Sequence, residues 1–559
     1  MGRLALAGIA WLGLAGGPGG EPSAPSAPRP FAAEAPRGWA GEPAGVPSPL
    51  PLPGDFDAWA EWWQAQRREY FAPTPWAEID GELGLDGEEG QPAGAALEGQ
   101  LRSRAGALAL AALGAPSALL RRAGLIATAR LGGPDAVERI APLADDGDRE
   151  VRQAALLALA TAGGEGARTR LLALAGTEKP RPEAALETGT ALIALGLLRQ
   201  GTVDTRCDEL VEARLSAAAG LPPELASGAV LHAKLARAEA CYPAVRVVAA
   251  DEHVQSPVRA LAMETLALSR DARDLEFLSS LLAHRDADLR RSAALALGAA
   301  RDPRATDALL AAVTEERNLA ARGFLVLSLG KLATQGAVER LLIERQRASS
   351  LDRAWAWLAL GLSARAGDKR ARAALELSAD ARLQAGERAA ALVAIGLARQ
   401  TAAFEFSARA PTSTPEPIEA PYAADGLALT ATAAAREALV AGLERAGENS
   451  RARYAEGLAR MRHAADSPAL VAAWQRTATA GARREVGLAL GRHGSRETIA
   501  ALLAVAGDPK SPVADRATAL ESASMALSRK PLDRLRALTA DANVLALEPW
   551  ILELANSGL

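Results

Sequence analysis

Residues that commonly perform chemistry in proteins are few in this sequence, and they are scattered. The patterns Gly-x-Ser-x-Gly, His-Glu-x-x-His, Gly-x-Gly-x-x-Gly and the phosphate-binding loop are all missing. Ser328-Leu-Gly-Lys331 matches Ser-x-x-Lys in form, but it belongs to a repeated Leu-x-Leu-Gly-x-Leu segment and lacks companion motifs. The five histidines share no metal-binding spacing: His232, His253, His284, His463 and His493. The sequence therefore predicts no catalytic centre, no metal site and no cofactor.

The two cysteines, Cys207 and Cys241, are 34 residues apart and form no Cys-x-x-Cys motif. This spacing is close to one unit of the repeat described below, so the two side chains could face each other across neighbouring units. In an exported protein they could form a disulfide. The alternative is that they are two buried thiols that pack as small apolar side chains.

Aromatic residues are concentrated near the N-terminus, where five of the ten tryptophans lie between Trp39 and Trp76. The segment 55–71, DFDAWAEWWQAQRREYF, places Trp59, Trp62 and Trp63 at helical spacing on one face. We expect a helix that closes the open end of a repeat array. The alternative is an exposed aromatic patch on which a partner docks.

A second candidate surface lies in the middle of the chain. Phe324 and Trp355 are 31 residues apart, about one repeat, and Lys331 is two helical turns beyond Phe324. Together with Arg291 they could form an aromatic and basic strip that binds a peptide. Packing of each aromatic ring against the next repeat explains Phe324 and Trp355 equally well.

The elements that must position these residues come from a repeat that starts near residue 100. An Arg is followed eight residues later by Gly, and the anchors recur in steps close to 30–35 residues or multiples of them. Each unit contains two short stretches with apolar residues at helical spacing, separated by Gly, Asp or Pro. In 285–313, for example, we expect one helix to begin after Asp286 or Asp288 and to stop at Gly298. The pairs are Arg290 with Gly298, Arg322 with Gly330, Arg353 with Gly361, Arg388 with Gly396 and Arg483 with Gly491.

This arrangement, D-x-x-[VL]-R-x-A-A-x-A-L-G-x-x-x-D-P-x-A, resembles the HEAT repeat in its short bacterial, phycobilin-lyase-type variant. The resemblance covers about residues 100–559; the region 200–250 and a loop near 401–425 depart from it, and the loop contains the insert FEFSARAPTSTPEPIEAPYAADG at 404–426. It implies an all-α superhelix, a solenoid of stacked helical hairpins. It also implies that turn Asp and helix-start Arg residues link adjacent repeats, a role expected for Asp286, Arg290, Arg322 and Arg353. A Trp-rich helix before such units is similar to large exported bacterial HEAT proteins.

Composition agrees with an array rather than several unrelated domains. Of the 559 residues, 49% are hydrophobic but only 4% are aromatic, and Ala and Leu supply most of the apolar side chains. Small side chains let helices approach closely, so a core with few aromatic rings can still pack. The net charge of -4 argues against nucleic-acid binding through bulk positive charge. No uncharged segment is long enough to span a membrane.

The N-terminal residues predict export. Residues 1–15, MGRLALAGIAWLGLA, have one basic residue, an apolar run and a small-x-small end, the layout of a signal peptide. The alternative is an apolar tail or a misplaced start codon. Residues 16–54 are rich in Pro and Gly and predict a disordered linker. We divide the rest into a Trp-rich helix and loop at 55–98 and a solenoid of about 13 units at 99–559.

Taken together, the sequence predicts an exported protein, periplasmic or extracellular, that is not an enzyme. Its expected role is a protein-interaction scaffold with an unidentified protein or peptide as partner and no nucleic acid. Two enzyme groups use related repeats and supply the alternative, the HEAT-like phycobilin lyases and the HEAT-like alkylpurine DNA glycosylases. The first needs a tetrapyrrole pocket and the second a cationic groove, and the sequence identifies neither.

Overall fold

The structure is a computed structural model in which the chain divides into the units Met1–Pro43 and Ala44–Leu559. It describes residues 57–555 except for gaps at 72–91, 134, 178–183, 200–202, 270, 348, 377–382, 401–418, 529–537 and 544. The expected signal peptide and linker, and most of the expected loop insert, lie outside the described residues. All statements below concern the second unit.

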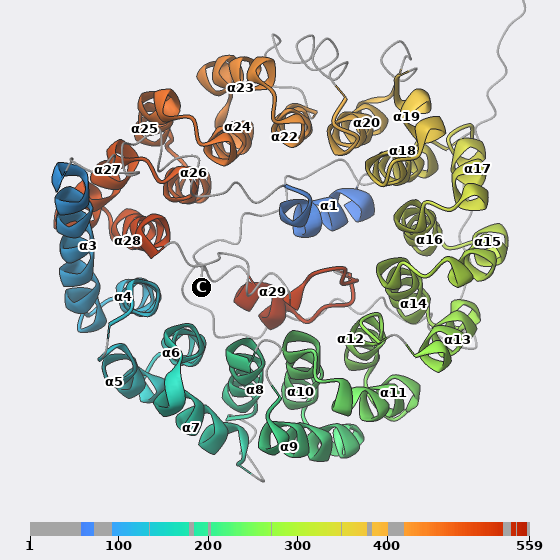
Figure 1. Cartoon of the computed structure of the whole chain (residues 1–559), viewed down its shortest axis with the longest axis horizontal. Helices are drawn as coiled ribbons and strands as arrows, with labels where there is room; N and C mark the ends of the chain where they lie inside the picture. The colour runs from blue at the N-terminus through green and yellow to red at the C-terminus, as the bar shows by residue number, and fades with distance from the viewer. Residues whose placement is uncertain are drawn as a thin grey trace, which may run out of the picture. The chain divides into compact units, whose positions relative to one another are not determined.

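The described residues of this unit form helices and no strands, and most helices lie in two concentric layers (Figure 1). The expected all-α solenoid of helical hairpins is confirmed. The inner helices are α4 (Ala118–Leu131), α6 (Arg149–Ala162), α8 (Ala185–Arg199), α10 (Pro223–Ala236), α12 (Ser256–Leu266), α14 (Ala287–Ala300), α16 (Leu319–Leu332), α18 (Ser350–Arg365), α20 (Ala385–Leu397), α22 (Ala420–Thr430), α24 (Glu448–Met461), α26 (Ala480–His493) and α28 (Val513–Ser528). The outer helices are α3 (Pro92–Leu113), α5 (Ala136–Ile140), α7 (Gly164–Ala175), α9 (Thr205–Ser216), α11 (Tyr242–Ala250), α13 (Ala272–Ser280), α15 (Thr306–Glu315), α17 (Gln335–Glu344), α19 (Lys369–Glu376), α23 (Ala433–Arg445), α25 (Ser467–Arg476) and α27 (Arg496–Gly507).

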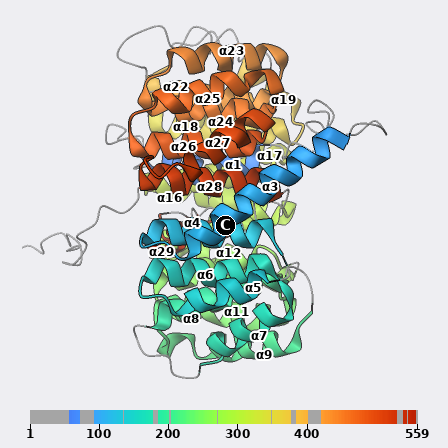
Figure 2. The ribbon, with the colours of Figure 1, turned by 90° about the vertical axis from the view of Figure 1, so that its left-hand side faces the viewer.

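The inner layer closes on itself. Each inner helix packs against the next, from α4 to α28, and α28 packs against α4 again (Figure 1). Helix α3 crosses this junction and contacts α4, α27 and α28 (Figure 2). There Arg102 donates to the backbone oxygen of Leu527 at 2.5 Å, and Arg104 donates to that of Leu503 at 3.3 Å. The described helices therefore form a ring without the open end that we expected a helix to cap.

Two further helices lie inside the ring, α1 (Asp57–Tyr70) and α29 (Pro549–Ala555) (Figure 1). We call the interior that they occupy the lumen. Several inner helices, among them α16, α18 and α22, are therefore covered on both sides, by the outer layer and by the contents of the lumen. This explains why consecutive residues such as 354–364 of α18 are all buried.

Acidic and hydroxyl side chains begin many of the helices, as the sequence predicts for 285–313. The carboxylate of Asp286 accepts the backbone N–H of Asp288, which caps α14. It also accepts the hydroxyl of Ser256 at 2.8 Å and so connects α14 to the preceding repeat. The expected stop at Gly298 is wrong, because α14 continues to Ala300. Its C-cap is Arg301, which has a left-handed φ of 53°.

The expected loop at 404–426 is wrong at its C-terminal end. Residues from Ala420 onward form α22, an inner helix of the ring. Pro421 is compatible with this because it lies in the first turn, where a helix needs no N–H donor from it.

The repeated glycine has a different role from the helix stop that we expected. It lies inside an inner helix at the point where the next inner helix comes closest. A methyl group at Gly361 would lie 2.6 Å from the Cα of Ala394, and one at Gly330 would lie 2.6 Å from the Cα of Ala359. Equivalent contacts occur at Gly298 with Ser328, Gly396 with Gly426 and Gly491 with Ser522. Glycine is needed here because the neighbouring backbone leaves no room for a Cβ.

The repeated arginine links consecutive units, as the resemblance implied. Arg353 donates to Glu387 at 2.9 Å and to the backbone oxygen of Arg347, in the loop before its own helix, at 2.7 Å. Arg353 thus ties the loop before its helix to an acid of the following inner helix, whereas Arg322 reaches back to the backbone oxygen of Val313 in α15. Ion pairs also join Arg121 to Asp146, Arg152 to Glu187, Arg290 to Glu316, Arg322 to Glu344, Arg388 to Glu419 and Arg483 to Asp515.

We predict that Gly361→Ala lowers the free energy of unfolding by about 1–3 kcal/mol, because the added methyl group forces α18 away from α20. Urea denaturation followed by circular dichroism measures the change. Gly106→Ala in α3 is the matched control, since nothing lies within 4 Å of the added methyl group. The control should be neutral, or more stable by up to about 1 kcal/mol, because alanine favours helix. Equal stability of the two variants would contradict the close approach of the inner helices.

Candidate peptide-binding site in the lumen

The tryptophan-rich helix α1 is bound to the inner face of the ring. The ring of Trp59 lies 5.2 Å from that of Tyr422 on α22, and the ammonium of Lys331 on α16 lies 5.7 Å from the ring of Trp62. The indole N–H of Trp63 donates to Asp425 at 2.9 Å. All three tryptophans are buried. The segment is helical as expected, but it is neither an end cap nor an exposed aromatic patch.

A buried ion pair accompanies the tryptophans. One turn after Trp63, the guanidinium of Arg67 bonds Asp425 at 3.0 Å on α22 and also pairs with Glu456 on α24. Burial acts to lower the pKa of Arg67, but the two carboxylates outweigh it and raise the pKa. Burial raises the pKa of Asp425, against the effect of Arg67. A charge this deep is tolerated only when it is paired, so the inner face is complementary to α1 in charge as well as in shape.

Two indole groups of α1 are less well accommodated. In the described part of the chain, the N–H groups of Trp59 and Trp62 are buried and have no hydrogen-bond partner. A buried donor without an acceptor costs about 1–3 kcal/mol. The packing of α1 in the lumen therefore includes an energetic penalty that an apolar side chain of similar shape would not incur.

The lumen also holds a second segment of the chain, residues 538–543, beside α1. The polar contacts come from α1 and from two lysines of the inner helices. Gln66 donates to Thr539 O at 2.5 Å and accepts Asp541 N at 2.9 Å, Lys234 donates to Leu538 O at 3.3 Å and to Ala540 O at 2.8 Å, and Lys331 pairs with Asp541. Most of these bonds go to backbone atoms, as in other proteins that bind extended peptides.

The last residue of this segment, Asn543, contacts α12 and α14. Its backbone N–H donates to Glu264 at 2.7 Å, and its side-chain amide donates to Ser292 at 3.1 Å. Burial raises the pKa of Glu264 to about 7, although Lys234 and the N–H of Asn543 act in the opposite direction. Glu264 is therefore a lumen carboxyl whose charge changes near neutral pH.

The structure separates the four residues of the strip expected in the middle of the chain. Phe324 and Trp355 pack against each other between repeats, with ring centroids 5.1 Å apart, and both are buried. Arg291 is largely buried and paired with Asp288, and burial lowers its pKa. Lys331 alone of the four contacts the contents of the lumen. Phe324 and Trp355 thus pack between repeats, as the alternative interpretation stated. Lys331 contacts Trp62 instead.

Sequence reasoning missed Arg67, Gln66, Asp425 and Glu456. The segment QAQRREY does place an arginine one turn after Trp63, which is the one local signal for the ion pair. Its acceptors lie 358 and 389 residues away along the chain, and nothing in the sequence near them marks them.

Comparison with known families matches the chain at residues 107–188 to the model for HEAT repeats. These residues run from the end of α3 to the first turn of α8, and the same helical hairpin recurs around the ring. The chain is a HEAT-repeat protein. No curated protein matches it.

Solved structures similar to this HEAT ring include importin-type solenoids and two smaller proteins. Importin beta is 12% identical, with 82% of this chain and 72% of that chain covered and a TM-score of 0.33. Human deoxyhypusine hydroxylase is 21% identical, with 50% and 95% covered and a TM-score of 0.23. The CpcE–CpcF complex of phycocyanin lyase from Nostoc is 21% identical, with 51% and 94% covered and a TM-score of 0.26. Identities and scores this low say nothing of a shared activity.

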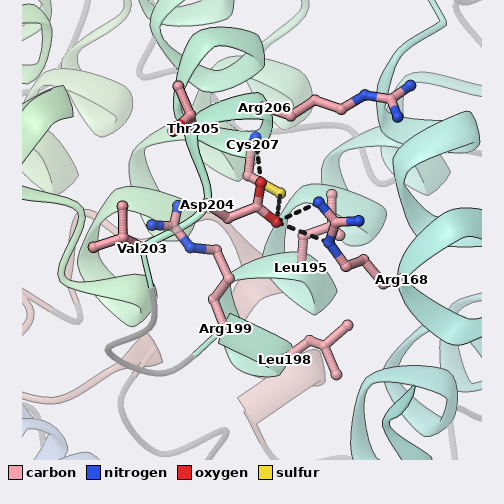
Figure 3. Close-up of a pocket in the computed structure, with 9 residues that line it drawn as sticks. All are labelled: Arg168, Leu195, Leu198, Arg199, Val203, Asp204, Thr205, Arg206 and Cys207. Atoms are coloured by element: carbon pink, nitrogen blue, oxygen red, sulfur yellow. Dashed lines mark hydrogen bonds and ion pairs between the residues drawn. The ribbon is translucent and has the colours of Figure 1, made fainter. Parts of the chain in front are cut away.

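Outside the lumen, a hollow of about 540 Å³ lies beside α9 (Figure 3). Asp204 caps α9 and lies between two of the labelled side chains, accepting Arg168 at 2.8 Å and the thiol of Cys207 at 3.2 Å. Burial and this acceptor raise the pKa of Cys207 to about 12. A thiol that stays protonated is a poor nucleophile, so the position of Cys207 does not activate it for covalent chemistry.

The two cysteines are free thiols in this structure, so the disulfide alternative is not formed. Cys241 directs its sulfur to the backbone oxygen of Asp208 at 3.8 Å, and burial raises its pKa to about 12. Each thiol thus has its own acceptor, Asp204 at the N-cap of α9 and Asp208 within it, and the pair fits the interpretation of two buried thiols. Among the described residues, no group of three or more His, Cys, Asp or Glu could hold a metal ion. None of the described helices is both long and apolar enough to cross a membrane.

We predict that Glu264→Gln alters how the stability of the ring depends on pH. The pKa of Glu264 rises from 4.5 to about 7 on folding, so its contribution is most favourable below pH 4.5 and declines as the pH rises through 7. Glutamine cannot ionise and keeps an acceptor for Asn543. The free energy of unfolding of the variant relative to wild type should therefore rise between pH 5 and pH 8, by up to about 3 kcal/mol.

Urea titrations at several pH values measure this difference, and buried histidines such as His232 affect both proteins equally. Glu315→Gln, which changes an exposed carboxyl on α15, is the control and should give no such divergence. Parallel pH profiles for wild type and Glu264→Gln would contradict the prediction.

Proposed function

We propose that this HEAT-repeat protein is a non-catalytic scaffold that binds protein or peptide segments on the inner face of its ring. The observation that carries the proposal is that this face already holds two segments of polypeptide, a helix and residues 538–543. It holds them through specific contacts rather than through apolar packing alone, with Asp425 and Glu456 on one side and Lys234 and Lys331 on the other. Solenoids present extended surfaces of this kind and need no reactive group.

The chemistry of the buried polar groups supports a role without catalysis. Glu264 has a pKa suited to proton transfer, but its carboxylate bonds the N–H of Asn543 and lies beneath that segment. The thiols of Cys207 and Cys241 remain protonated at neutral pH. These contacts favour a role in holding the chain together over contact with a substrate.

We expect the full-length chain, used as bait in the envelope fraction of its native source, to recover a protein partner in near-stoichiometric amount. Mild cross-linking before extraction retains weak complexes, and mass spectrometry identifies them. The reverse experiment, with the partner as bait, should recover this chain and excludes non-specific retention. If neither the envelope fraction nor the secreted fraction yields a partner in both directions, the scaffold proposal is wrong.

The same preparation separates the scaffold from the two enzyme alternatives. Incubation with a linear tetrapyrrole should leave its absorption spectrum unchanged, and incubation with alkylated duplex DNA should release no free base. A net charge of -4 makes DNA binding unfavourable. A shifted spectrum or a released base would favour the lyase-like or the glycosylase-like function instead.

The proposed location is outside the cytoplasm, periplasmic or extracellular, as the residues MGRLALAGIAWLGLA indicate. We expect cell fractionation to find the protein there and N-terminal sequencing of the mature chain to begin after Ala15. A cytosolic protein that retains residues 1–15 would contradict export.

A further inference from the structure

We propose that the lumen is a binding site for an amphipathic helix of a partner protein, and that α1 occupies this site as a displaceable internal ligand. The inference rests on the proposed scaffold function and assigns the chemistry of the partner. The recognised helix carries a tryptophan and, one turn later, an arginine, with apolar or aromatic side chains on the turn before them.

The first support is that α1 is not a structural part of the ring. Each inner helix packs on the next inner helix and on its outer helices, and α28 closes the circuit on α4 with α3 across the junction. None of these contacts involves α1. The helix therefore relates to the ring as a bound peptide does to its receptor.

The second support is a carboxylate of the inner face, Asp425, whose hydrogen-bond partners lie on α1. Within the described residues, the two hydrogen bonds that Asp425 accepts come from Trp63 and Arg67. When α1 leaves, Asp425 loses both of these partners, while Glu456 keeps its ion pairs with Arg460 at 2.9 Å and Arg492 at 3.3 Å. An acidic side chain in this position, next to the ring of Tyr422, suits an arginine and an aromatic side chain on one face of a helix.

The third support is that α1 is an imperfect ligand. Its Trp59 and Trp62 side chains are buried while their N–H groups find no acceptor in the described part of the chain. A partner helix with phenylalanine, leucine or methionine at these positions avoids that penalty and keeps the contacts of Trp63 and Arg67. It can therefore compete with α1, although α1 has the advantage of being tethered.

The test uses the whole chain with a protease recognition sequence inserted after Gly87, between α1 and α3. The probe is a fluorescein-labelled peptide of residues 55–71, and its binding is measured by fluorescence anisotropy. Before cleavage we expect binding at least about 100-fold weaker than after cleavage, because tethered α1 acts at millimolar effective concentration. After cleavage the peptide should bind saturably and release the fragment that contains α1, which size-exclusion chromatography detects.

Matched variants test the chemistry. A peptide with Arg67→Glu should bind the cleaved chain at least about 30-fold more weakly, because it brings an unpaired acid to Asp425 and Glu456. In the cleaved chain, Asp425→Asn should weaken binding of the wild-type peptide, whereas Glu339→Gln on the exposed outer helix α17 should not. Circular dichroism melting shows that both ring variants remain folded.

Three outcomes would overturn the inference: the fragment stays bound without exchanging, the two peptides bind alike, or cleavage changes nothing. If the partner capture succeeds while these peptide results fail, the scaffold function stands and uses another surface. If the peptide exchanges but no partner is recovered in either direction, the lumen serves only its own helix and the scaffold function fails.

Discussion

The close approach of consecutive inner helices is the constraint on which the rest of the ring depends. At Gly330, Gly361 and Gly491 a single added methyl group would meet the backbone of the next inner helix at 2.5–2.6 Å. The alanine-rich faces around these glycines keep the spacing small at each step. The arginine links reinforce the same contacts between successive units, since each arginine pairs with an acid further along the chain. A ring closes only if many such steps add up, so each small contact has a consequence at the junction of α28 and α4.

Closure of the ring also determines how its inner face must be covered. The inner helices are rich in buried alanine and leucine, and an apolar wall left uncovered on their inner face would be unfavourable in water. The three tryptophans of α1 cover part of this wall with far fewer residues than aliphatic side chains would need. The buried charges Arg67, Asp425 and Glu456 add little net stability as a group, because desolvation offsets their attraction. Their contribution is the orientation and register of the helix.

Much of the repeated hairpin structure could be predicted from the sequence, because the residues that determine each hairpin lie close together in the chain. The Asp286 cap, the arginine period and the helical spacing of alanine and leucine all act within one or two units. The same locality explains the errors. Gly298 has the sequence context of a helix stop because glycine commonly ends helices, whereas the glycine is required by the close approach of Ser328 in the next repeat. Phe324 and Trp355 fit both packing and binding at the same spacing, and only the three-dimensional contacts distinguish the two. The contacts that create the lumen site span 358 and 389 residues, so no local pattern marks them.

The two segments in the lumen depend on each other. Gln66 of α1 donates to the backbone oxygen of Thr539 and accepts the backbone N–H of Asp541. Departure of α1 therefore removes two hydrogen bonds from residues 538–543, and Lys331, which contacts both Trp62 and Asp541, loses one of its two neighbours. Because coupling of this kind is reciprocal, loosening of the segment at Glu264 or Lys234 must also weaken the hold on α1. The binding of α1 near α22 is thus connected to the binding of residues 538–543 near α12 through hydrogen bonds between the two segments.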